Sequence, residues 1–229
     1  MSGGARVGVT RLWDLPVRII HWSFVALIPA LWWTAEEKMM TWHMRLGTVL
    51  FALIVFRVLW GFFGSSTARF ASFVKGPGAV LRYFAAMGRR KSGGSHAATI
   101  GHNPAGGWSV VALLGLMSLQ VGLGMIGGDA DDGSAGPLNH LVGFELAYDA
   151  TEWHTEIVFN LILAFIGLHL AAILFYRLIL RDNLIAPMIT GSRPAHGIAT
   201  VAGMVPVPAW RAVACAVIAV GAAVTVWVV

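Results

Sequence analysis

The sequence predicts an all-α integral membrane protein, with a bundle of four transmembrane helices and a fifth transmembrane helix near the C-terminal end. Of the 229 residues 57% are hydrophobic and only 12% are charged, too few charges to cover the surface of a soluble fold of this size. Nearly uninterrupted apolar runs of about 20 residues, long enough to cross a bilayer, occur five times. They are 17–34, 46–63, 108–126, 157–180 and 210–229. We therefore expect the chain to be embedded in lipid.

The charges between the runs predict the orientation. Segment 64–107 holds six basic residues and no acid: Arg69, Lys75, Arg82, Arg89, Arg90 and Lys91. Segment 127–153 holds six acids and no Lys or Arg: Asp129, Asp131, Asp132, Glu145, Asp149 and Glu152. By the positive-inside rule the N-terminus and the basic segment are cytoplasmic, and the acidic segment is an outer loop. Because the basic residues are explained by topology, we expect no nucleic acid partner.

The chain is expected to divide into three parts. Residues 1–190 form the four-helix domain, 191–208 a linker with three prolines and three glycines, and 209–229 the additional helix. The third run follows GHNPAGGW, in which Asn103 is a good N-cap and Pro104 fits the first helical position.

Four histidines lie in or beside the apolar runs: His21, His43, His154 and His169. An imidazole inside a bilayer is costly unless it has a partner, so each is a functional candidate. His154 and His169 are fifteen residues apart, which on an α-helix is roughly 22 Å along the axis and about 60° around it. One helix would thus present two imidazoles to the same interior. The other histidines, His96, His102, His140 and His196, fall in polar segments and are expected to be solvated.

Depth predicts two pairs. His43 precedes a run that starts outside and pairs with His154, while His21 comes early in a run that starts inside and pairs with His169. Two facing neutral imidazoles are the ligand set of a six-coordinate haem iron. The spacing excludes one metal site shared by all four. Cys215 is the only cysteine, which excludes covalent CxxCH attachment and makes the haems non-covalent. The alternative for any single buried histidine is a helix–helix hydrogen bond.

Three arginines could bind the haem propionates. Arg57 lies fourteen residues after His43, about 40° from the same helix face and near the depth of the inner pair. A buried arginine there needs an anion, and a propionate is suitable. Arg18 and Arg45 could serve likewise, or could simply extend to the membrane interface.

Five stretches resemble the prokaryotic cytochrome b561 family, which is related to the b-type cytochrome subunit of nickel-iron hydrogenases. They are DLPVRIIHW, WHMRLGTVLFALIVFRVLWGFFGSSTARF, GHNPAGGW, WHTEIVFNLILAFIGLHL and RDNLIAPMITG. The resemblance covers residues 11–191. It implies a four-helix bundle with two haems b ligated by the four histidines. It also implies electron exchange with ubiquinone or menaquinone, or with a c-type cytochrome or hydrogenase-like partner. The fifth run and the acidic loop depart from the shortest members and leave the subfamily open.

The sequence thus predicts a bis-histidyl dihaem cytochrome b of a bacterial inner membrane. It would transfer electrons between a quinone pool and a redox partner in respiratory electron transport. It could be an electron-transfer protein in its own right or the cytochrome b subunit of an oxidoreductase, and a homodimer stays open. The acidic outer loop could dock a basic partner, or its acids could merely be tolerated there.

Two other functions remain as alternatives. A haem-free metal or proton transporter would use the same histidines, but it would want carboxylates beside them, and carboxylates are missing from the middle of every run. A membrane anchor or assembly factor would carry the histidines incidentally.

Overall fold

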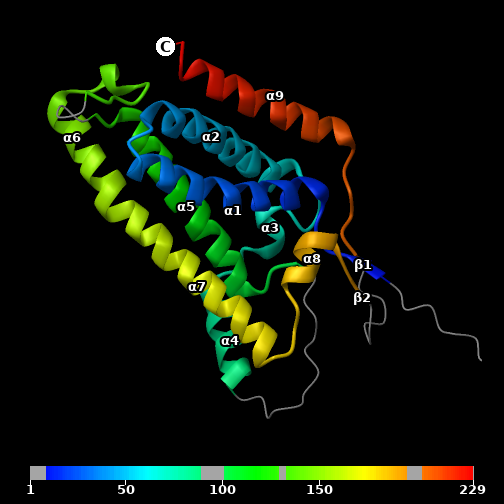
Figure 1. Cartoon of the computed structure of the whole chain (residues 1–229). Coiled ribbons are helices and arrows are strands. Elements are labelled where there is room, and N and C mark those ends of the chain that lie inside the picture. Colours follow the sequence, from blue (N-terminus) through cyan, green and yellow to red (C-terminus); the bar gives the residue numbers. More distant parts are fainter. Residues whose placement is uncertain (1–8, 89–100, 129–132, 195–202, 229) are drawn as a thin grey trace, which may run out of the picture.

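The computed structural model describes residues 9–88, 101–128, 133–194 and 203–228, which form helices and one small sheet (Figure 1). Four helical segments of this part are long and apolar enough to cross a membrane. They are α1 (Leu15–Glu36), α2 (Met40–Phe63), α5 (Pro104–Ile126) and the continuous segment Phe144–Leu178. The four spans predicted for the bundle are therefore present as helices of spanning length.

The first two helices form an antiparallel hairpin that Asp14 closes. Asp14 caps α1 by accepting the N–H of Val17 on Oδ1 at 2.8 Å. Its other oxygen accepts the indole N–H of Trp60 at 2.8 Å, which ties the start of α1 to the end of α2. Between the helices the chain turns at Lys38, which has a left-handed φ of 55°. The antiparallel hairpin therefore keeps His21, early in α1, and His43, early in α2, near opposite ends of the bundle, as predicted.

The predicted start of the third span is confirmed. Asn103 Oδ1 accepts the N–H of Gly106 at 2.7 Å, and Pro104 is the first helical residue of α5. Apolar side chains of α5 then form the core with α2 and the fourth span: Leu50, Ile54, Leu114, Met117, Val121, Val158 and Ile162. This core fills the middle of the bundle, between the histidines near its two ends.

The fourth span begins earlier than predicted. The helix α6 (Phe144–Glu152) continues without a break into a π-helix, η2 (Trp153–Val158), and then into α7 (Phe159–Leu178). The expectation of a loop over 127–153 is therefore wrong for α6, although 133–143 is loop apart from the 3-10 turn η1 (Asn139–Leu141). The acids Glu145, Asp149 and Glu152 interrupt the apolar run without interrupting the helix. Residues 129–132, with three of the predicted acids, lie outside the described residues.

The two ends of the bundle differ in structure (Figure 1). We call the end formed by the α1–α2 turn and α6 the turn end. The opposite end, here the cap end, carries five other short elements. These are β1 (Val9–Arg11), β2 (Ser192–Pro194), α3 (Phe70–Phe73), α4 (Pro77–Gly88) and α8 (Ile185–Thr190). Strands β1 and β2 pair antiparallel.

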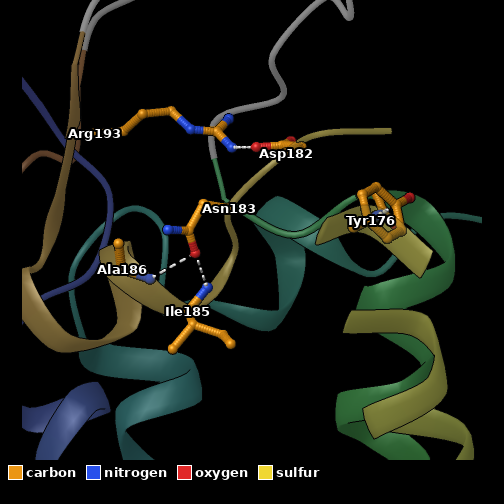
Figure 2. Close-up of polar contacts among 7 residues, drawn as sticks. Tyr176, Asp182, Asn183, Ile185, Ala186 and Arg193 are labelled. Carbon is orange, nitrogen blue, oxygen red and sulfur yellow. Dashed lines mark hydrogen bonds and ion pairs between the residues drawn. The ribbon is translucent and has the colours of Figure 1, made fainter. Parts of the chain in front are cut away.

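Polar contacts fix the segment after α7 at the cap end (Figure 2). Asn183 Oδ1 accepts the N–H groups of Ile185 and Ala186, both at 3.1 Å, and so starts α8. Asp182 forms an ion pair with Arg193 of β2. The chain leaving the fourth span is thereby tied back to the sheet that precedes the first.

The predicted linker is partly structured, and the fifth run packs on α2. Met204 donates its N–H to the carbonyl of Arg11 at 2.8 Å, while 195–202 lie outside the described residues. Helix α9 (Ala209–Thr225) then runs antiparallel to α2 (Figure 1). Arg211 donates to the carbonyl of Phe63, and Trp227 Nε1 donates to Thr48 Oγ1 at 2.9 Å. With 17 residues α9 is shorter than the four spans, so a fifth transmembrane span stays a prediction.

Candidate cofactor sites at the two ends of the bundle

At the turn end two of the predicted histidines face each other. The ring centroids of His43 in α2 and His154 in η2 are 6.1 Å apart, with an interplanar angle of 80°. Metal–imidazole bonds are about 2 Å long, so two rings on opposite sides of one metal have centroids roughly 6 Å apart. The spacing of this pair therefore suits two axial ligands of one iron.

Backbone carbonyls orient both rings of this pair. The Nδ1 of His43 lies 3.0 Å from the carbonyl oxygen of Leu31, and the Nδ1 of His154 lies 2.8 Å from that of Gln120. A carbonyl can only accept, so each Nδ1 carries the hydrogen and donates it. The Nε2 of each ring is left with a free lone pair, the usual arrangement of a metal-binding histidine.

The π-helix and Gln120 hold His154 in place. In a π-turn one residue is added to the helix without advancing its face, so the angle between His154 and His169 changes from about 60° to about −40°. The two histidines still share one face. Gln120 donates from Nε2 to the backbone carbonyl of His154 at 2.8 Å, while its own carbonyl accepts from the ring. A Cβ on Gly124 would lie 2.8 Å from Cε1 of His154, so a glycine is needed there.

At the cap end the second predicted pair is less constrained. His21 of α1 and His169 of α7 are close enough for their charges to interact. The Nδ1 of His21 is buried and has no hydrogen-bond partner among the described residues. The structure thus brings His21 and His169 to the same end, but no backbone carbonyl in the described ranges fixes the His21 ring.

A comparison with known families now bears on both sites. A family model described as prokaryotic cytochrome b561 matches residues 12–191, which include all four histidines. The chain belongs to the prokaryotic cytochrome b561 family. This confirms the resemblance found in the motifs, and it leaves α9 outside the matched range. No curated protein and no solved structure matches the chain.

Members of the cytochrome b561 family are membrane b-type cytochromes of electron transfer and bind haem b. The donor set of this chain fits that group, because iron binds neutral imidazole nitrogens and the turn-end pair offers two of them with free lone pairs. No cluster of three or more His, Cys, Asp or Glu side chains suited to a bare metal ion occurs in the described ranges.

The three arginines of this cytochrome b561 chain lie in different surroundings. Arg57 is buried, with 7% of its surface exposed, and one hydrogen bond, to the carbonyl of Ala68 at 3.4 Å. Its guanidinium carbon also lies 5.4 Å from the ring centroid of Phe70. Arg18 has a buried Nε that no described residue pairs with. Arg45 is exposed and stacks on Trp42, as an arginine extending to the interface does.

His102 is a site residue that the sequence analysis missed. We expected a solvated ring, but the structure packs it between Trp13 and Phe73, with centroids at 4.6 and 4.9 Å. Burial, with a smaller effect of the nearby Arg57, lowers the pKa of His102 to about 3. The helix start directly after it was the available clue, because the residue before an N-cap often packs against the first turn of the helix. His140 is exposed as expected, and His96 and His196 lie outside the described residues.

Proposed function

We propose that the chain holds two haems b and transfers electrons between the two faces of the membrane. His43 and His154 would bind one haem at the turn end, and His21 and His169 the other at the cap end. The observation that carries this proposal is the 6.1 Å spacing of the His43 and His154 rings, both with Nδ1 held by a backbone carbonyl.

Each part of the chain would have a distinct task. The histidines would hold the two haems, with two imidazole nitrogens offered to each iron. When bound, the haem irons supply one-electron chemistry by alternating between the ferric and ferrous states. The apolar core between the ends, including Ile54, Met117 and Val158, excludes water from the space between the sites. The buried Arg57 would neutralise a haem carboxylate, and we keep the same role for Arg18 and, at the turn end, for Arg45.

The distribution of charge supports an orientation. Lys75 and Arg82 flank or belong to α4 at the cap end, whereas Glu145, Asp149 and Glu152 belong to α6 at the turn end (Figure 1). By the positive-inside rule the cap end would face the cytoplasm of a bacterium with the chain in its inner membrane. Electrons would pass between a quinone pool and a redox partner, and a c-type cytochrome docking on the acidic α6 is one such partner.

Haem counting tests this function. The chain is purified in detergent, and haem is determined per polypeptide as the pyridine haemochrome. We expect two non-covalent haems b in the wild type, one in His154→Ala and one in His169→Ala, with different reduced spectra for the two variants. His140→Ala, at an exposed histidine, serves as the control and should keep both. Fewer than two haems in a fully loaded wild type, or two in both ligand variants, would contradict the proposal.

A further inference from the structure

The cap-end site contains hydrogen-bond donors without matching acceptors. Within the described part of the chain, the buried Arg57 makes a single long hydrogen bond, and the buried Nε of Arg18 and Nδ1 of His21 have no partner. Asp14 is near enough to interact with the charge of Arg57, but its two oxygens already accept from Val17 and Trp60. Buried donors left unpaired cost free energy, so this site is suited to a group that brings acceptor oxygens and negative charge.

His102 lies beside the same site. Its ring interacts electrostatically with Arg57 of α2, His21 of α1 and His169 of α7. Trp13 and Phe73 form the aromatic walls on either side of it. No hydrogen bond to the ring occurs within the described part of the chain. A polar ring therefore lies between two aromatic side chains, close enough to Arg57, His21 and His169 to interact with them electrostatically.

The loop that carries His102 is held rigidly. Gly101 has a left-handed φ of 84°, which favours glycine. A Cβ on Gly107 would lie 2.7 Å from the carbonyl oxygen of Phe73, so α5 starts in close contact with α3. Asn103 caps α5 and also donates from Nδ2 to the hydroxyl of Tyr176 in α7 at 2.8 Å. These contacts fix the position of His102 relative to both α5 and α7.

The charge state of His102 determines which hydrogen bonds its ring can make. The groups that face it are the guanidinium of Arg57 and two imidazoles, so a second positive charge is disfavoured there. With a pKa of about 3 the ring is neutral at pH 7 and offers one N–H donor. It can thus donate to an anion without adding to the positive charge already present.

We infer that His102 donates a hydrogen bond to a carboxylate of the haem held by His21 and His169, the same carboxylate that Arg57 neutralises. This inference rests on the proposed function and adds a haem-binding residue to it. His102 would act as a positioning residue, because it fixes the charge beside the iron and is not an iron ligand.

Redox titration of three variants tests the inference. His102→Leu removes the donor, His102→Gln keeps an N–H donor, and His140→Leu is the control at an exposed histidine. The cap-end haem is identified as the absorption lost in His169→Ala. We expect His102→Leu to lower the midpoint potential of that haem only, because a less well-bonded carboxylate leaves more negative charge near the iron. His102→Gln should stay close to the wild type, and His140→Leu should change neither potential.

Two outcomes would overturn the inference. If the wild type binds two haems but His102→Leu and His102→Gln have equal potentials, His102 does not act through a donated hydrogen bond. If His102→Leu loses the cap-end haem, retention of that haem in His102→Gln supports the inference and loss in both contradicts it. A second readout uses protein reconstituted with haem dimethyl ester, in which the difference between wild type and His102→Leu should disappear. A wild type without two haems would instead refute the proposed function itself.

Discussion

Each of the two candidate sites contains its own pair of histidines, but the protein holds the two pairs in different ways. At the turn end each ring donates to a backbone carbonyl, of Leu31 or Gln120, and the rings already stand at the separation that one iron requires. At the cap end the Nδ1 of His21 has no partner in the part of the chain that the structure describes, and buried cations and donors lie nearby. Backbone carbonyls therefore orient the histidines at the turn end. At the cap end the site instead contains buried positive charge and donors, which a bound anion would neutralise and pair.

Among variants that should affect one site and not the other, the largest effect is expected from Gly124→Val. A Cβ added at this position would lie only 2.8 Å from Cε1 of His154, so the still larger valine side chain should displace that ring. We expect loss of the turn-end haem, that is, about one haem per chain, with the cap-end haem retained. Gly122→Val is the matched control, because a Cβ there meets no atom within 4 Å. The pyridine haemochrome count measures both, and equal counts in the two variants would contradict the close contact.

A smaller effect should follow from Arg57→Leu. Hydrogen bonds to charged groups contribute about 1.5–3 kcal/mol, so the affinity for the cap-end haem should fall by roughly 10- to 100-fold. The haem-free protein should become more thermostable, because a buried charge without an ion pair is removed. Haem titration measures the expected loss of affinity. Thermal unfolding with and without haem measures the expected gain in stability of the haem-free protein. Arg45→Leu, at an exposed arginine, should change each by much less, and similar effects of both variants would show that burial does not distinguish them.

The smallest expected effect is a pH dependence of the haem-free protein. The pKa of His102 is about 3 in the folded chain and near the ordinary 6.5 in the unfolded chain, so between these values only the unfolded chain binds the proton. Stability is therefore lost as pH falls from about 6.5 toward 3, and His102 contributes no pH dependence above 6.5. At pH 5.5 the loss is about 1 kcal/mol. His102→Gln should remove this part of the slope in thermal unfolding, and an unchanged slope would contradict the lowered pKa.

Features set by composition were predictable from the sequence. The apolar runs located the four bundle helices, Asn103 and Pro104 located the start of α5, and helix direction brought His43 and His154 to one end. These follow from local patterns and chain order. The pairing itself was inferred from depth alone, and the 6.1 Å spacing is a result of tertiary structure.

Other features depend on contacts that no local pattern encodes. Helix α6 was missed because its acids end the apolar run, although glutamate, which supplies two of them, is a good helix former. The π-helix requires one extra residue accommodated by packing, and the role of Gln120 depends on the carbonyl of His154 in that π-helix. His102 was missed because the polarity of its loop says nothing about the aromatic side chains that enclose it.

The length of the fourth span has a consequence for access from the water phase. The 35 residues of Phe144–Leu178 would extend about 52 Å, whereas the hydrocarbon layer is about 30 Å thick. Helix α7 alone, with its 20 residues, matches that thickness, so α6 would stand clear of the lipid and the π-helix would lie at the boundary. His154 would then sit just beneath the membrane surface. A soluble protein resting against α6 could approach this site without any segment of its own entering the bilayer.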